Sequence, residues 1–150
     1  MSPNNLSGSR RERAVQLVLR RHPNAKRVLI MYGANDGEPS GLGLHPGDAG
    51  YAGSFKDYMQ RIINDLNSAG KMPILAKAPP TPYDSARNNR IQGYNNVVAE
   101  LVADPNNHIT ITPPDFFTYF SSNLGQLGDG VHPNGVGYQS MANLWFQVLK

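Results

Sequence analysis

The sequence predicts an α/β fold, in which helices cover both faces of a parallel β-sheet and form a three-layer sandwich. Segments that predict strands, at 27–32, 71–78 and 108–112, alternate along the chain with segments whose apolar residues recur at helical spacing. The first run is apolar almost throughout, as in strands buried on both faces. The 150 residues suffice for one domain with a buried core, and no repeat or change of composition divides them. We therefore treat 1–150 as a single domain.

Composition excludes several classes of protein. The chain has no cysteine, which excludes disulfides, thiolate metal sites and a cysteine nucleophile. No apolar run is long enough to span a membrane, and the polar, arginine-rich N-terminus lacks the apolar stretch of a secretory signal peptide. The net charge is only +3, but half of the basic residues precede position 28. No aromatic residues are interleaved with them, so a solvated helix face is favoured over a nucleic-acid patch. We expect neither nucleic-acid nor membrane partners.

The first third of the chain predicts a loop, a helix, a strand and a long loop. A helix is expected from about Ser9 to Arg21, ended by His22, Pro23 and Asn24. The strand at 27–32 then enters a loop over 33–53 that is rich in Gly and Pro. Loops of this length in a compact domain are usually functional or disordered.

The clearest helical pattern follows this loop. Ser54 can cap a helix, with Asp57 three residues later, and Gly70 can end it. The second strand, 71–78, follows and enters a proline-rich loop. The remaining expected elements are a helix over 90–103, a third strand over 108–112, a short helix over 115–121, and a final helix. The last of these is expected to bury Tyr138, Met141, Ala142, Trp145 and Leu149.

Asp129 and His132 form the strongest candidate for a catalytic pair. An imidazole is a useful general base when a carboxylate on its far nitrogen fixes its tautomer and orientation. Residues three apart on one tight turn can make this contact, and Gly130 and Pro133 favour such a turn. The alternative is a polar turn that caps the final helix, with His132 as a bystander.

Asn35 is the second candidate. It directly follows the first strand, and ligands of parallel sheets bind at the carboxyl ends of the strands. A fixed side-chain amide there can stabilise a developing oxyanion. We therefore expect Asn35 to face the same cavity as His132. The alternative is a turn residue that bonds to its own backbone.

These residues carry a family resemblance. The first strand and Gly33-Ala34-Asn35-Asp36 resemble the GxND block of the SGNH (GDSL-type) hydrolases, and Asp129-Gly130-Val131-His132-Pro133 resembles their DxxHP block. Both motifs are weak alone, but the pair occurs in the family's order, each after a strand. The resemblance covers nearly the whole chain and implies the flavodoxin-like SGNH fold with its N-terminal strands missing.

The resemblance also implies residue roles. His132 would be the base, Asp129 would orient it, and Asn35 would donate to the oxyanion. Gly33 would permit the turn after the strand, and Gly8 would supply a second, main-chain oxyanion donor. The family's nucleophile belongs to a Gly-Asp-Ser block that this sequence does not contain. Ser7 and Ser9 are poor substitutes because no strand precedes them to hold a nucleophile elbow, so the nucleophile is unknown.

The resemblance thus implies a serine ester hydrolase acting on an acyl or carbohydrate ester, a small-molecule substrate, without cofactor or metal. The isolated chain is expected to be a poor catalyst. The rival interpretation is a non-catalytic binding module on the hydrolase scaffold. A metal-dependent phosphoesterase is disfavoured because metal-spaced His and Asp ligands are missing. Without the family's first strand, 28–32 would be an exposed edge, which predicts self-association or pairing with a missing N-terminal segment.

Overall fold

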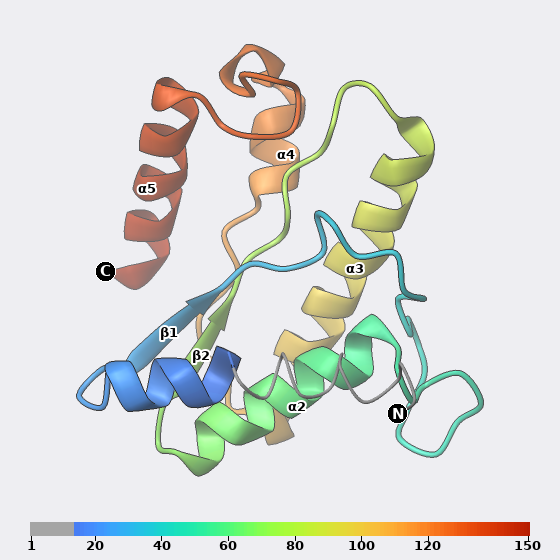
Figure 1. Cartoon of the computed structure of the whole chain (residues 1–150), viewed down its shortest axis with the longest axis vertical. Helices are drawn as coiled ribbons and strands as arrows, with labels where there is room; N and C mark the ends of the chain where they lie inside the picture. Colours follow the sequence, from blue (N-terminus) through green and yellow to red (C-terminus); the bar gives the residue numbers. More distant parts are fainter. Residues whose placement is uncertain (1–13) are drawn as a thin grey trace, which may run out of the picture.

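The α/β prediction is confirmed. The computed structural model describes residues 14–150, and it is rich in helix around a small parallel sheet (Figure 1). Residues 14–21 are helical, and the expected start of this helix at Ser9 lies outside the described residues. The named elements that follow are β1 (Arg27–Ile30), α2 (Phe55–Ser68), β2 (Met72–Leu75), α3 (Ser85–Ala103), η1 (Pro105–Asn107), α4 (Phe116–Ser121), η2 (Leu124–Gln126) and α5 (Gly135–Leu149).

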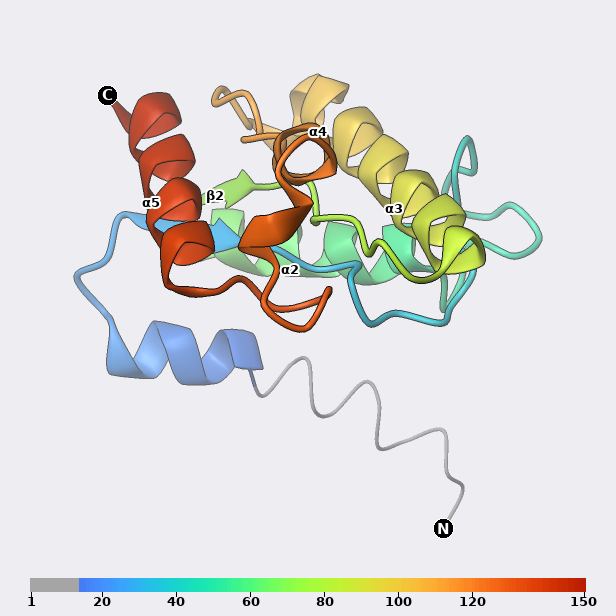
Figure 2. The ribbon, with the colours of Figure 1, turned by 90° about the horizontal axis from the view of Figure 1, so that it is seen from above.

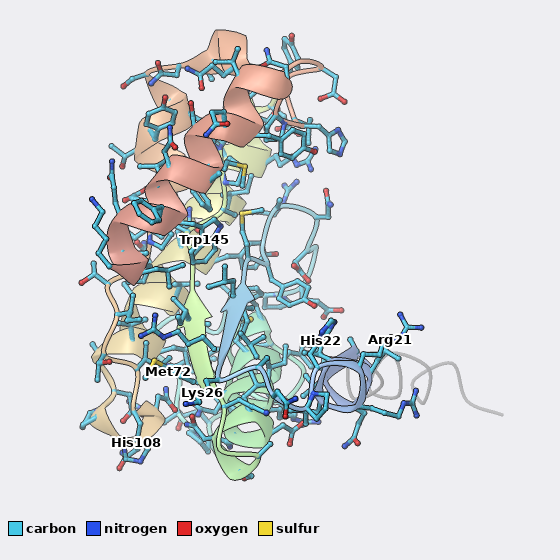
Figure 3. The ribbon with its side chains drawn as sticks, turned by 90° about the vertical axis from the view of Figure 1, so that its left-hand side faces the viewer. Arg21, His22, Lys26, Met72, His108 and Trp145 are labelled. Carbon is cyan, nitrogen blue, oxygen red and sulfur yellow. The ribbon has the colours of Figure 1, made fainter. Side chains whose placement is uncertain are left out.

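The sheet consists of β1 and β2, which pair in parallel with Arg27 opposite Met72. Main-chain hydrogen bonds extend the pairing beyond both ends, from Met72 N to Lys26 O (2.9 Å) and from Ala76 N to Ile30 O (2.9 Å). Figure 3 shows Lys26 and Met72 at the same end of the two strands. The two loops that follow the strands therefore leave from the other, carboxyl end, where a site was expected.

The predicted third strand, 108–112, is wrong. Residues 108–112 form no strand or bridge, and the isolated parallel bridge nearby joins Lys77, after β2, to Asp115. His108 adopts a left-handed conformation (φ 53°) where it ends η1. The following Pro113 and Pro114 have no N–H groups, so they cannot donate to a ladder. Only the carbonyl of Pro114 is used, by the N–H of Lys77 (3.1 Å).

Two apolar clusters hold helices to the two faces of the sheet. The larger joins residues 14–21, α2 and α3 to the strands, and its buried members include Val15, Ile30, Met59, Ile63, Leu66, Leu75, Tyr94, Val98 and Leu101. The smaller joins α4 and α5 to Ala76 through Phe116, Phe120 and Leu127. Figure 2 shows α4 and α5 on the opposite side of the strands from residues 14–21. The layers are those of the predicted sandwich.

The burial predicted for α5 is only partly correct. Tyr138 is 60% exposed and Ala142 is also exposed, while Met141, Trp145 and Leu149 are half-buried. Figure 3 shows Trp145 on the side of α5 that faces the fold, where its ring packs edge-on against Phe116. The helix therefore buries one narrow stripe, because two strands offer little surface to cover.

The capping prediction for α2 is confirmed, and α3 begins earlier than predicted. Ser54 caps α2 by accepting a hydrogen bond from the N–H of Asp57 (3.2 Å). α3 begins at Ser85 rather than near residue 90, because Asp84 accepts from the N–H of Arg87 (2.9 Å) and caps it.

The side of β1 that faces away from β2 has no strand among residues 14–150. Leu29 in β1, and Met31 and Tyr32 directly after it, are 46%, 38% and 48% exposed. A cavity of about 270 Å³ runs beside β1, between the strand, residues 14–18 and α2. None of the described helices is long and apolar enough to cross a lipid bilayer.

Candidate active site

Asp129 and His132 make the contact that their spacing predicts. The imidazole Nδ1 lies 2.7 Å from Asp129 Oδ2. The other carboxylate oxygen accepts from two main-chain N–H groups, those of Val131 (2.9 Å) and His132 (2.7 Å). Because a carboxylate only accepts, the ring proton sits on Nδ1, and Nε2 of the neutral ring carries the free lone pair. The turn thus fixes the tautomer that a general base needs.

Two contacts hold this turn, a main-chain hydrogen bond within it and the ring of Tyr83 from the loop after β2. The N–H of Gly128 donates to the carbonyl of His132 (2.8 Å), which closes the turn. Gly130 has φ +79°, and a Cβ at this position would lie 1.9 Å from a ring carbon of Tyr83. Glycine is therefore required at position 130 for its backbone angle and for the contact with the Tyr83 ring.

The charge of Asp129 is stabilised by these donors. The hydrogen bond from His132 holds the pKa of the Asp129 carboxyl well below its usual range, and the two main-chain N–H groups act in the same direction. The pair is open to solvent, with 61% of the Asp129 side chain and 70% of the His132 side chain exposed. The carboxylate is ionised at neutral pH and available to hold a protonated imidazole.

The loop after β1 places Asn35 at its surface. Gly33 is buried, has φ +108°, and donates its N–H to Asp36 Oδ2 (3.1 Å). The hydroxyl of Tyr94 on α3 contacts the carbonyls of Asp36 (2.9 Å) and Glu38 (2.5 Å). These contacts tie the start of the loop to α3, and Asn35 lies between the tied residues.

Asn35 itself is held by Arg87, a residue that the sequence did not single out. Nη2 of Arg87 donates to Asn35 Oδ1 (2.7 Å) and to the carbonyl of Ala34 (2.8 Å). The two side chains line a cavity of about 410 Å³ together with Asp36, Arg90 and Tyr94. The signal that could have revealed Arg87 is the Asp84 cap three residues before it, because that cap places Arg87 in the first turn of a helix.

That Asn35 and His132 face the same cavity stays a prediction. His132 does not line the cavity beside Asn35. The two motifs are linked indirectly: Arg87 holds Asn35, Asp84 caps the helix of Arg87, and Tyr83 packs on Gly130. Both loops nevertheless leave the same end of the fold, beyond the carboxyl ends of the strands (Figure 1).

Two further predicted features concern the nucleophile and the second oxyanion donor. Gly8, Ser7 and Ser9 lie outside the described residues. Among the serines at positions 14–150, none hydrogen-bonds to His132. In the same range no three His, Asp or Glu side chains cluster in a way that could hold a metal ion.

Comparisons with known proteins agree with the motifs. The profile of the GDSL-like lipase/acylhydrolase family matches residues 3–140. The fold is similar to the crystal structure of a member of the lipolytic protein G-D-S-L family from Veillonella parvula DSM 2008, with a TM-score of 0.66 and 20% sequence identity. The alignment covers 92% of this chain and 73% of that one. No curated protein sequence matches the chain.

Proposed function

The chain belongs to the GDSL-like lipase/acylhydrolase family, and from this premise we propose that it is a serine ester hydrolase whose general base is His132. The observation that carries the proposal is the 2.7 Å contact between His132 Nδ1 and Asp129 Oδ2. It leaves Nε2 as the proton acceptor and provides a carboxylate to stabilise the imidazolium. Membership of a hydrolase family alone would not assign these roles.

In the proposed reaction, Nε2 of His132 takes the proton of a serine hydroxyl as its oxygen attacks the ester carbonyl. The carbonyl oxygen becomes an oxyanion, which the side-chain amide of Asn35 stabilises; in well-studied hydrolases one such donor contributes about 3–4 kcal/mol. When the tetrahedral intermediate collapses, the C–O bond to the alcohol breaks and His132 returns the proton to that alcohol. Water then cleaves the acyl-enzyme by the same sequence of steps.

The substrate proposed is a small acyl or carbohydrate ester. The cavity beside Asn35 is lined mainly by polar and charged side chains, among them Asp36, Arg87 and Arg90. Such a lining suits hydroxyl or carbonyl groups better than a long alkyl chain. For this reason short p-nitrophenyl esters are the first substrates to test.

The test combines turnover with covalent labelling. Slow hydrolysis of p-nitrophenyl acetate is expected, because the sequence has no Gly-Asp-Ser block to present the nucleophile. His132→Ala should abolish turnover, and Asp129→Asn should lower kcat by about 10²–10⁴-fold. His22→Ala, which changes an exposed histidine of the N-terminal turn, should have no effect. A fluorophosphonate probe should label one serine, which peptide mapping would identify.

A second candidate is a non-catalytic binding module on the same scaffold. The observation that favours it is the lack, within residues 14–150, of a serine bonded to His132. This function predicts no fluorophosphonate adduct and no turnover, together with saturable binding of an ester or its acid product. An adduct that forms in the wild type and is lost in His132→Ala would exclude it.

A further inference from the structure

The guanidinium group of Arg87 bridges two oxygens of the loop after β1. Nε and Nη2 donate to the carbonyl of Ala34 (3.2 and 2.8 Å), and Nη2 also donates to Asn35 Oδ1 (2.7 Å). The backbone at Arg87 is itself fixed, because its main-chain N–H donates to the capping carboxylate of Asp84 (2.9 Å). The first turn of α3 therefore controls the conformation of a loop residue 52 positions earlier in the sequence.

This contact decides which way the amide of Asn35 points. A guanidinium group only donates, so the atom of Asn35 that faces it must be the oxygen. The amide nitrogen is then turned away, and no described residue accepts a hydrogen bond from it. Asn35 lines the cavity of about 410 Å³. An orientation with the nitrogen toward Arg87 would place donor against donor.

The charge of Arg87 adds to this effect. No carboxylate among residues 14–150 lies within ion-pair distance of its guanidinium, so contact with an anion does not neutralise it. A hydrogen bond from a cation to the amide oxygen polarises the amide and strengthens its N–H donors.

We propose that Arg87 is a positioning residue, which holds the side chain of Asn35 as a hydrogen-bond donor toward the cavity. The proposal rests on the proposed function only for its consequence in catalysis. The orientation of Asn35 can be measured whether or not the chain hydrolyses esters. Arg90 provides a matched control, since it lines the same cavity from the next turn of α3 and makes no hydrogen bond to Asn35.

The experiment follows the side-chain amide of Asn35 in ¹⁵N-labelled full-length chain by NMR. Asn35→Asp removes this amide and identifies its two proton signals. In Arg87→Ala the signals should move to the position of a free asparagine side chain and exchange faster with water. In Arg90→Ala they should stay in place. Free guanidinium, at concentrations far below those that unfold the chain, should restore the wild-type signals in Arg87→Ala.

Arg87→Lys covers the case in which Arg87→Ala does not fold. The lysine side chain is shorter, so its ammonium ends short of the position that Nη2 occupies, and the Asn35 signals should shift in the same direction. Unchanged Asn35 signals in both variants would overturn the proposal. Equal shifts in Arg87→Ala and Arg90→Ala would also overturn it, because the effect would then belong to the cavity as a whole.

The catalytic consequence is measured separately. Where the wild type hydrolyses p-nitrophenyl acetate, Arg87→Ala should lower kcat about tenfold with little change in KM, since the donor acts on the transition state. In an Asn35→Ala background the same substitution should cause no further loss; a further tenfold loss would assign Arg87 a role apart from Asn35. A wild type without turnover refutes the proposed function and leaves the NMR result to decide the role of Arg87.

Discussion

Removing one hydroxyl group tests whether α3 holds the loop after β1. Tyr94 is 1% exposed, its ring packs against Phe55 with centroids 4.7 Å apart, and its hydroxyl contacts the carbonyls of Asp36 and Glu38. Burial, together with the nearby charge of Asp36, raises the pKa of Tyr94, so the hydroxyl remains a neutral donor across the working range of pH. Tyr94→Phe keeps the ring and its packing, and removes only this donor.

The expected cost of Tyr94→Phe follows from the surroundings of the two carbonyls. A hydrogen bond contributes about 0.5–1.5 kcal/mol net, and a buried polar group left without a partner costs about 1–3 kcal/mol. Asp36 is half-buried and Glu38 is exposed, so water can replace part of what is lost. We therefore expect the free energy of unfolding to fall by about 1.5 kcal/mol. For a chain of this size that corresponds to a Tm lower by about 3–6 °C.

Urea titration followed by circular dichroism measures this change, and amide hydrogen exchange localises it. The denaturation midpoint should fall with an unchanged m-value, and the amides of residues 36–44 should exchange faster than in the wild type. Tyr83→Phe is the matched control, because Tyr83 is 78% exposed and no described residue hydrogen-bonds to its hydroxyl. A change for Tyr94→Phe within about 0.5 kcal/mol, the range of neutral surface substitutions, would show that this hydroxyl does not hold the loop.

Three more predictions concern other parts of the fold. Gly130→Ala should destabilise the chain by about 1–2 kcal/mol in thermal denaturation, because φ is positive there. Adding Tyr83→Ala should restore only the stability lost to the steric contact with the Tyr83 ring. Full recovery would show that the backbone angle of residue 130 contributes nothing to the loss. Burial opposes ionisation of Asp115, but hydrogen bonds from Lys77 and from the main chain outweigh it and lower the pKa of Asp115. The stabilisation by ionised Asp115 is therefore present above the unfolded pKa of about 3.9 and is lost as pH falls through the lower pKa of the folded chain. Asp115→Asn should flatten the dependence of Tm on pH below about 4. An unchanged slope of Tm against pH would contradict this. We also propose that the chain self-associates through the open edge of β1. The mass from light scattering should then rise with protein concentration, and Leu29→Lys should stay monomeric. A wild-type chain that is monomeric at every concentration would refute this proposal.

The sequence predicts those elements whose causes are local. α2 carries its own cap, Ser54 with Asp57, and its own apolar periodicity, and it forms as predicted. The Asp129–His132 contact spans three residues, and one tight turn suffices to make it. In both cases the interacting groups are neighbours along the chain, so their spacing already fixes the geometry.

The sequence does not predict a strand or a buried helix face that depends on segments far away in the chain. The run at 108–112 has alternation typical of a strand, but alternation does not place the run beside a partner strand, and the bridge nearby involves Asp115, after Pro113 and Pro114. The apolar residues of α5 have helical spacing, yet spacing cannot tell how wide the opposing surface is. With two strands beneath it, α5 leaves Tyr138 exposed.

The two parts of the candidate site, the Asp129–His132 pair and Asn35, also differ in whether nearby or distant residues orient them. The imidazole of His132 is oriented by Asp129 on its own turn, so small shifts of α3 leave that contact intact. The amide of Asn35 depends on Arg87 and therefore on where α3 begins, which the capping carboxylate of Asp84 determines. A change at the start of α3 would thus disorient Asn35, the proposed oxyanion donor, while His132, the proposed base, keeps its tautomer. The orientation of His132 can be predicted from one motif, whereas the orientation of Asn35 can be predicted only once the helix that holds it has been placed.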